Sequence, residues 1–140
     1  MNNPHIFDIL QRFQKGEITI DSATTALSTD AAQQLNHATV DTERLKRTGQ
    51  PETIFGEGKN VEQIVSIVQV LINNDQTAFV TRVDEQKGSR LLDTFPDGEW
   101  NAVGRTFLLH PPQIERSGDI ALICAGTSDL YVAEECHATL

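Results

Sequence analysis

The sequence predicts an α/β protein: an N-terminal helical hairpin and a small mixed α/β domain, followed by the first strand and helix start of a truncated doubly wound domain. Two observations carry this prediction. An apolar stripe at helical spacing in residues 61–72 is followed by a β-branched run at residues 77–83. Later, the apolar segment at residues 119–125 leads through a glycine turn into a second helical stretch, as in a βα unit whose strand is buried on both faces.

Length and composition narrow the possible partners. The chain has 140 residues, 39% hydrophobic and 22% charged, which suffices for one globular domain plus a piece of another. Eleven basic against twenty acidic residues give a net charge of −9, which argues against nucleic acid or an anionic membrane as a partner. No signal peptide or membrane-length apolar run is apparent, and two cysteines make no disulfide framework, so we expect a cytoplasmic protein.

Residues 1–37 are expected to form the helical hairpin and a linker. The first helix is predicted by apolar residues at helical spacing, namely Ile6, Ile9, Leu10 and Phe13. Gly16 ends this helix, and Asp21 or Ser22 caps a second one. The apolar surface of the hairpin is small, so we expect the hairpin to pack against another part of the protein or a partner. The polar stretch at residues 28–48 indicates a linker or a loosely packed arm.

Residues 38–116 are expected to form the α/β domain, and residues 117–140 to start the next one. Asn60 and Gln63 form an Asn variant of the capping box before the helical stripe. The expected elements, in order, are a strand at residues 53–55, a helix at 61–72, a strand at 77–83, a short helix around 91–95 and extended runs at 100–103 and 105–109.

The turn Gly126-Thr127-Ser128-Asp129 is the main candidate for ligand binding. It follows the expected strand 119–125 at the carboxyl edge, where α/β sheets bind ligands. Gly126 allows a ligand to approach the backbone, and the helix start attracts phosphate or carboxylate groups. Asp129 suits ribose hydroxyls or a proton transfer better than a phosphate. The alternative is that Ser128 or Asp129 only caps the helix.

Three cationic side chains are weaker candidates for anion contacts. Lys59 follows two glycines, but the spacing is not that of a phosphate loop, and a plain turn with a solvated lysine is the alternative. Arg47 has the geometry to grip a carboxylate or phosphate, or else pairs with acidic neighbours such as Asp41. Arg82, near a strand end, projects toward a cleft or faces solvent.

The histidines and cysteines indicate no metal site. None of the four histidines forms a zinc-like pattern with Cys124 or Cys136. Cys124 lies inside the apolar segment and is expected to be buried. Cys136 and His137 are neighbours on one helix, so their side chains diverge and do not form a catalytic pair.

Four segments, taken in order, carry a family resemblance. They are the motif Ala38-Thr39-Val40-Asp41-x-x-Arg44-x-x-Arg47-x-Gly49-x-Pro51-Glu52, the turn and helix start from Gly56 to Ile64, the pair Thr81-Arg82, and the segment from Ala125 to Glu135. This set resembles the LarB family, the pyridinium-3,5-biscarboxylic acid mononucleotide synthases of nickel-pincer cofactor biosynthesis. Tyr131 stands where a proline is common in the family motif.

The resemblance implies both a fold and a reaction. Residues 117–140 would begin a domain similar to aminoimidazole ribonucleotide carboxylase, the PurE fold. Family members convert nicotinate adenine dinucleotide, CO2 and water to the biscarboxylic acid mononucleotide and AMP. The matching positions Gly126, Thr127, Ser128 and Asp129 would bind the substrate, and CO2 or bicarbonate would be the co-substrate with no covalently bound cofactor.

The resemblance also implies what this chain lacks. The family's nucleophilic cysteine lies beyond Leu140, so we expect no catalytic residue in this chain and no activity of the chain alone. A homo-oligomer would form through the missing domain. Two alternatives stay open: a fragment of an aminoimidazole ribonucleotide carboxylase of purine biosynthesis, or a non-catalytic module for dinucleotide binding or oligomerisation.

Overall fold

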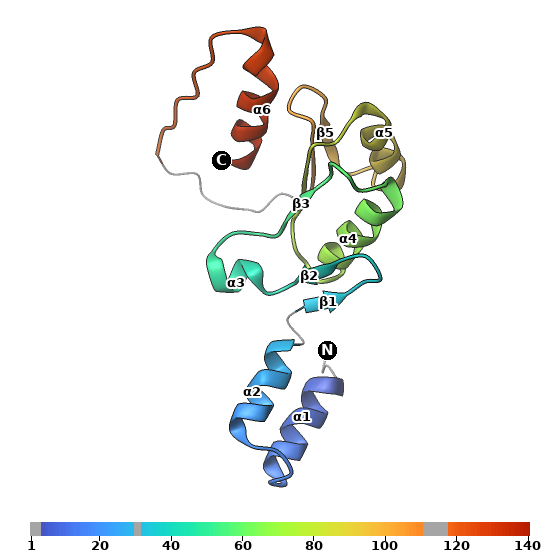
Figure 1. Ribbon diagram of the computed structural model, residues 1–140, viewed down its shortest axis with the longest axis vertical. Helices are drawn as coiled ribbons and strands as arrows, with labels where there is room; N and C mark the ends of the chain where they lie inside the picture. The colour runs from blue at the N-terminus through green and yellow to red at the C-terminus, as the bar shows by residue number, and fades with distance from the viewer. Residues whose placement is uncertain (1–3, 30–31, 111–117) are drawn as a thin grey trace.

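The computed structural model describes residues 4–29, 32–110 and 118–140. Figure 1 shows a helical hairpin, an α/β unit and a C-terminal segment that ends in a helix. The elements are α1 (Pro4–Gln14), α2 (Ile20–Thr29), β1 (Ala32–Gln34), β2 (Thr39–Asp41), α3 (Arg44–Thr48), β3 (Thr53–Phe55), α4 (Val61–Asn73), β4 (Ala78–Thr81), α5 (Glu85–Thr94), β5 (Glu99–Asn101), β6 (Thr106–Leu109), the 3₁₀ turn η1 (Thr127–Asp129) and α6 (Leu130–Thr139). Helices and strands are interleaved, so the predicted α/β class is confirmed.

A mixed four-stranded sheet with the order β3-β4-β6-β5 organises the α/β unit. β3 and β4 are parallel, with Ile54 opposite Val80, and α4 connects them. β6 is antiparallel to both β4 and β5, with Phe107 opposite Val80 on one side and Trp100 on the other. The carboxyl ends of the parallel strands β3 and β4 therefore lie at the same edge of the sheet.

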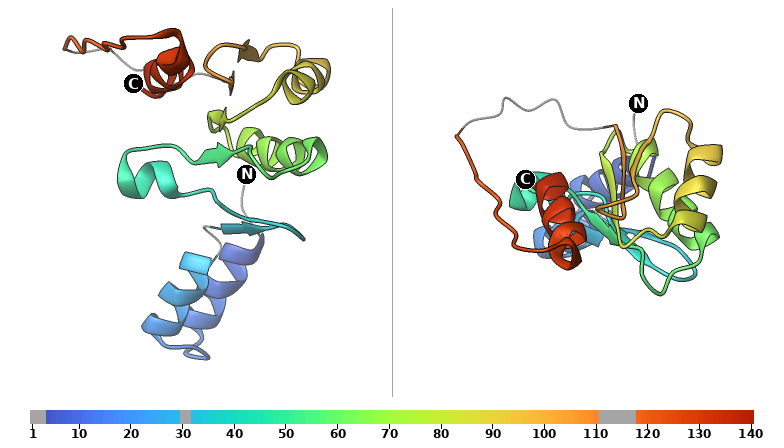
Figure 2. Two further views of the ribbon diagram at one scale, coloured as in Figure 1. Left: turned by 45° about the horizontal axis from the view of Figure 1, so that its top comes forward. Right: turned by 90° about the horizontal axis from the view of Figure 1, so that it is seen from above.

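The two faces of this sheet have different neighbours. Alternate residues Val80, Phe107 and Leu109 belong to the core with α4 and α5. Phe79 and Leu108 point to the other face, where the C-terminal segment lies. Figure 2 shows α4 and α5 on one side of the strands and α6 on the other. The C-terminal segment thus covers part of a sheet face that α4 and α5 leave open.

The helix α4 forms where the sequence predicts it, because both its start and its buried face are encoded locally. The Asn60 side chain accepts a hydrogen bond from the Gln63 N–H at 2.8 Å, and the Gln63 side chain accepts one from the Asn60 N–H at 3.0 Å. Its apolar stripe is buried against the sheet through Ile64, Val68 and Leu71, which are all fully buried. The capping box and the helix are confirmed.

Gly88 and Trp100 interlock where α5 meets β5. The helix α5 starts earlier than predicted because the Asp84 side chain accepts a hydrogen bond from the Lys87 N–H at 2.9 Å and caps it. A Cβ atom on Gly88 would lie 2.3 Å from Trp100 Cε2. The absence of a side chain at Gly88 therefore lets the indole ring pack directly on the helix backbone.

Gly88→Ala is expected to lower the free energy of unfolding by about 1–2 kcal/mol. Alanine favours a helix over glycine by about 1 kcal/mol, but a Cβ this close to an indole places the overpacking cost in the upper part of its usual range of about 1–3 kcal/mol. Urea unfolding measures the loss. Trp100 is the only tryptophan, so a shifted emission spectrum would report displacement of its ring. Ser89→Ala, at the exposed neighbouring position, is the control, and equal stability of the two variants would contradict the prediction.

The N-terminal hairpin is present, with one correction. The helices α1 and α2 pack on each other through the buried Ile9 and Ala23. The cap of α2 is neither Asp21 nor Ser22: the Thr19 hydroxyl accepts a hydrogen bond from the Ser22 N–H at 3.2 Å. The helix begins one residue before Asp21 because Thr19 takes the capping role.

The polar stretch predicted to be a linker or loose arm is instead partly ordered. The strands β1 and β2 pair in antiparallel fashion, with Gln33 opposite Val40. The sequence does not predict these two strands because they are short and mostly polar. Val40 is their one core residue, and it is buried only through its contact with the α4 side of the unit. The short helix α3 follows, ended by Gly49 in the left-handed region at φ 75°.

The predicted strand at residues 119–125 is wrong for this chain. These residues have no strand partner among the described residues and are exposed, with Ile123 at 93%. A fully apolar strand needs neighbouring strands to pair with it and helices to cover both faces of the sheet, and residues 119–125 have no strand partner in the described chain. Cys124, predicted to be buried there, is exposed for the same reason. The helix start after the glycine turn is confirmed as η1 and α6.

Candidate functional site

The predicted site residue Arg82 contacts helix α6 rather than solvent alone. It follows β4 at the carboxyl edge of the parallel pair and has a positive φ of 58°, a conformation that side-chain-bearing residues rarely adopt. Its Nε lies 3.0 Å from Glu135 Oε2, and its guanidinium carbon lies 6.0 Å from the centre of the Tyr131 ring. Arg82 therefore joins the sheet edge to α6 by an ion pair and a cation–π contact.

A second contact holds α6 against the turn between β5 and β6. Asn101 Nδ2 donates a hydrogen bond to Glu134 Oε2 at 3.2 Å, while Asn101 Oδ1 accepts one from the Gly104 N–H at 2.9 Å. A Cβ atom on Gly104 would lie 3.1 Å from Glu134 Cβ. The two adjacent glutamates, Glu134 and Glu135, thus anchor α6 at two separate points of the α/β unit.

The segment Gly126–Asp129 lies at the start of the helix that these contacts hold. Gly126 is extended, with φ −174° and ψ 160°, and the next three residues form η1. Asp129 occupies the N-cap position of α6, but its side chain makes no capping hydrogen bond. Ser128 Oγ donates to Asp129 Oδ1 at 3.3 Å. All four residues are exposed, so the alternative that Asp129 serves as a side-chain cap is not what the structure shows.

Gly126 has no steric reason to be glycine within the described chain. A Cβ atom there would meet only Ser128 Oγ, at the ordinary contact distance of 3.6 Å. By contrast, a Cβ atom on Gly56 would lie 2.7 Å from the Thr81 carbonyl oxygen. A glycine is therefore needed at position 56, because the backbone segments after β3 and β4 approach each other closely there. Close packing therefore requires a glycine at position 56, whereas it does not require one at position 126.

Lys87 is a cation at the carboxyl edge that the sequence reasoning missed. Its Nζ donates to the Gly56 carbonyl at 3.1 Å and lies 3.5 Å from Asp84 Oδ2. The pKa of the Asp84 carboxyl is held below its ordinary value, first by the hydrogen bond from the Lys87 N–H. The spacing Asp84-x-x-Lys87 is a helix-cap signal that could have found it. Gly56, Arg82 and Lys87 thus gather at one edge of the sheet.

The other two predicted cations have local partners. Arg47 Nη2 lies 2.5 Å from Asp41 Oδ2, the ion pair offered as the alternative to an anion site. Lys59 Nζ donates to the Phe55 carbonyl at 2.8 Å, and its side chain lines a small cleft of about 210 Å³ along β3 with Glu52. Neither Arg47 nor Lys59 makes a contact that joins it to Arg82 or to the segment Gly126–Asp129 among the described interactions.

The Asp41–Arg47 pair predicts a pH dependence of stability. The pKa of the Asp41 carboxyl lies below its ordinary value, chiefly because the Arg47 side chain donates a hydrogen bond to it. A depressed folded pKa gives stabilisation that is complete above the unfolded pKa of about 3.9 and is lost as the pH falls through the folded value.

We therefore expect Asp41→Asn to lower the free energy of unfolding at pH 7 by about 0.2–1 kcal/mol, and this difference to shrink as the pH drops below about 4. Urea unfolding at several pH values measures it. Asp93→Asn is the control, because Asp93 is exposed and has no ion pair in the described part of the chain. A constant difference between pH 7 and pH 2 would contradict the prediction.

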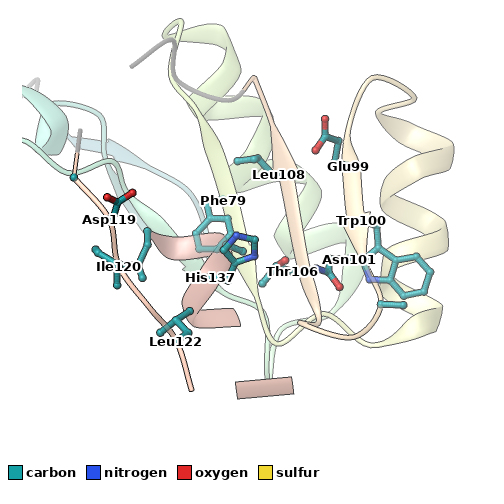
Figure 3. Close-up of a pocket in the computed structure, with 14 residues that line it drawn as sticks. Phe79, Glu99, Trp100, Asn101, Thr106, Leu108, Asp119, Ile120, Leu122 and His137 are labelled. Atoms are coloured by element: carbon teal, nitrogen blue, oxygen red, sulfur yellow. The ribbon is translucent and has the colours of Figure 1, made fainter. Parts of the chain in front are cut away.

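An open cleft of about 1050 Å³ separates the free sheet face from the C-terminal segment. Figure 3 shows Phe79 and Leu108 of the sheet in its lining, together with Ile120, Leu122 and His137 of the C-terminal segment. Its described lining contains the acidic residues Glu99 and Asp119 but no lysine or arginine, and none of the seven predicted site residues. This lining does not suit a phosphate. It is space between two parts of the chain, which sequence spacing could not reveal because five separate segments form it.

In residues 4–29, 32–110 and 118–140, no side-chain cluster suits a metal ion and no helix suits a membrane span. No group of three or more His, Cys, Asp or Glu side chains there is arranged to hold a metal ion. None of the described helices is both long and apolar enough to cross a bilayer. Cys124 and Cys136 are both free thiols on the surface.

Comparison with known proteins places the α/β unit in a family context. Residues 32–111, more than half of the chain, match the family described as the LarB/PurE-like N-terminal domain. The chain is also similar to the uncharacterized protein MJ0165 of Methanocaldococcus jannaschii, with 26% identity over 143 residues. That alignment covers 95% of the chain but 55% of the archaeal protein, so the chain spans about half of that relative's length.

Proposed function

The chain belongs to the family of LarB/PurE-like N-terminal domains, and from this we propose that it is the N-terminal part of a carboxylase and phosphoanhydride hydrolase of the LarB type. The family match over residues 32–111 is the observation that carries the proposal. The reaction converts nicotinate adenine dinucleotide, CO2 and water to pyridinium-3,5-biscarboxylic acid mononucleotide and AMP. The reaction thus combines a carboxylation of the pyridinium ring with the hydrolysis of a phosphoanhydride.

The proposed chemistry needs groups that this chain does not supply. A pyridinium carbon is too electron-poor to attack CO2, so a cysteine thiolate first adds to the ring and makes it an enamine-like nucleophile. Loss of a ring proton and of the thiolate after carboxylation restores the pyridinium, and water cleaves the phosphoanhydride to release AMP. We assign the thiolate to sequence beyond Leu140. Cys124 and Cys136 are exposed free thiols, and we assign neither of them this role.

Substrate binding is assigned to Gly126, Thr127, Ser128 and Asp129. Three observations support this assignment. All four residues are exposed, the Asp129 side chain makes no capping hydrogen bond, and Gly126 has no packing reason to lack a side chain. Arg82 holds α6, and hence this segment, against the sheet edge through Glu135 and Tyr131. Arg82 is therefore assigned a positioning role, and Arg47 and Lys59 stay secondary candidates for anion contacts.

Residues 117–140 are proposed to start a second, PurE-like domain. The exposed apolar segment 119–125 and the open cleft beside it support this, because the further strands and helices of such a domain would bury the segment and fill the cleft. The relative is almost twice as long as the aligned region. The 140-residue chain is then inactive by itself, and the second domain supplies one homo-oligomer interface of the enzyme.

The test compares two proteins. One is the 140-residue chain, and the other is the chain extended by the part of the Methanocaldococcus protein that follows the aligned region. Both are incubated with bicarbonate and, in separate reactions, with nicotinate adenine dinucleotide or aminoimidazole ribonucleotide. AMP, the carboxylated mononucleotide and any carboxylated aminoimidazole ribonucleotide are quantified. We expect both products from the extended protein only. Turnover by the short chain would overturn its inactivity, and turnover of aminoimidazole ribonucleotide instead would establish the purine-pathway alternative.

Asp129→Asn in the extended protein is expected to lower kcat/KM for the dinucleotide by roughly 100-fold, the scale of losing a positioned carboxylate. Asp97→Asn, an exposed position in the turn before β5, is the matched control and should leave kcat/KM unchanged. Circular dichroism confirms that both variants are folded. Equal rates for Asp129→Asn and the unmodified protein would remove Asp129 from the site.

A second candidate is a non-catalytic module that binds a dinucleotide or mediates assembly. The α/β unit favours it, because it has its own buried core from Val40 to Leu109 without the C-terminal segment. Titration calorimetry of the 140-residue chain with nicotinate adenine dinucleotide distinguishes the cases. Tight binding of the dinucleotide to the 140-residue chain, together with no turnover by the extended protein, would support the non-catalytic module.

A further inference from the structure

The N-terminal hairpin carries an apolar surface that the described residues leave uncovered. This surface, here called the hairpin seam, consists of five apolar side chains of α1 and α2 that are between 39% and 64% exposed. They are Ile6, Phe7, Leu10, Phe13 and Ile20. We propose that this seam is a homodimerisation surface, on which the hairpin of a second copy of the chain packs. The proposal concerns assembly through the hairpin and does not depend on the proposed reaction.

The hairpin has too little buried surface to be stable alone. The helices α1 and α2 have 11 and 10 residues, below the length of roughly 12–15 residues at which isolated helices become even marginally stable. Among their described side chains only Ile9 and Ala23 are buried. Figures 1 and 2 show the hairpin projecting away from the α/β unit, so that unit does not cover the seam. A further apolar surface is needed to hold the two helices together.

The pattern and the size of the seam fit a second hairpin. Ile6, Leu10 and Phe13 lie at i, i+4 and i+7, so they form one continuous stripe along α1. Two such stripes facing each other would complete a four-helix arrangement around one core, and a two-fold interface uses the same patch on both copies. The exposed parts of the seam amount to roughly 500 Å² per hairpin, so two copies would bury about 1,000 Å², the lower bound for a specific interface.

The charge distribution also favours contact between hairpins. Residues 4–29 contain two basic side chains, Arg12 and Lys15, and three acidic ones, Asp8, Glu17 and Asp21, so their net charge is −1. The whole chain carries −9. The hairpin therefore contributes little to the like-charge repulsion between two copies, and the seam itself contains no charged residue. Asp8 and Arg12 pair with each other at 3.9 Å on the polar face of α1.

Sedimentation velocity of the 140-residue chain from about 1 to about 200 μM tests the proposal, because small interfaces commonly bind in the micromolar range. We expect a monomer–dimer equilibrium within this range. Leu10→Ala should raise the dimer dissociation constant at least roughly tenfold, since it removes a central apolar side chain but keeps a strong helix former. Gln11→Ala, at the exposed neighbouring position, is the matched control and should change the constant by less than about twofold.

Hydrogen exchange gives a measurement that does not rely on a variant. Amides of α1 and α2 should exchange more slowly as the concentration of the unmodified chain rises, whereas those of α4 should not change. A chain that sediments as a monomer at all concentrations would overturn the proposal. A dimer that Leu10→Ala leaves intact would also overturn it, because the interface would then lie elsewhere, such as at the exposed apolar segment 119–125.

Discussion

Phe107→Ala should lower the free energy of unfolding by about 3–5 kcal/mol, the cost of removing a fully buried aromatic ring. Phe107 is the central core residue of β6 and is completely inaccessible to solvent. Its ring lies 6.4 Å from that of Phe95, and the chain at Gly98 approaches so closely that a Cβ atom there would be 2.3 Å from Phe107 Cζ. The end of α5 and the turn that leads from it into β5 pack against the ring, so its removal leaves a cavity.

Urea unfolding of the 140-residue chain measures this effect. Phe55→Ala is the matched control: Phe55 is the same residue type in the same sheet, but it is 51% exposed on the edge strand β3. We expect a loss of about 1 kcal/mol or less for this control, because less apolar surface is lost and water already reaches the site. Similar losses for both variants would mean that Phe107 does not organise the core.

Leu71→Ala is expected to cost about 2–5 kcal/mol, the range for buried leucines. Leu71 is fully buried in the last turn of α4, where the helix covers the sheet. Its carbonyl oxygen also accepts hydrogen bonds from the N–H groups of Asn74 and Gln76, so the side chain and the helix end are fixed together. Loss of the side chain weakens both the helix–sheet contact and the turn that leads into β4.

Thermal unfolding followed by circular dichroism checks the Leu71 prediction. A loss of this size should lower Tm by roughly 10 °C or more for a cooperative unit of this length. Gln69→Ala is the control on the same helix, because Gln69 is exposed and its side chain bonds only to Asn73 in the described structure. A drop of only a few degrees in Leu71→Ala would show that the sheet face under α4 collapses to fill the space.

Local patterns allowed a correct prediction wherever an element depends on its own residues. The helix α4 was predicted at residues 61–72 and found at Val61–Asn73, because the Asn60 cap and the apolar stripe are both within the helix. The strand β3 and the pair β5 and β6 were predicted close to their observed positions for a similar reason: glycines and β-branched or aromatic residues mark their limits.

Elements whose existence depends on distant partners were predicted poorly. The hairpin of β1 and β2 was missed because Val40 becomes a core residue only against α4. The strand at residues 119–125 was predicted from apolar composition, yet a strand needs a neighbour to accept its hydrogen bonds, and the described chain offers none. The contact of Arg82 with Glu135 and Tyr131 joins residues that no local spacing relates.

The sequence by itself determined the α/β class, the main helix and its cap, and the family resemblance, because these depend on the order and spacing of residues along the chain. The tertiary structure alone decided which sheet face stays open, how Arg82 anchors α6, and that residues 119–125 lie exposed. The physical reason is the range of the interactions. Propensity and capping act within a few residues, whereas burial and ion pairing across the sheet depend on how distant segments pack.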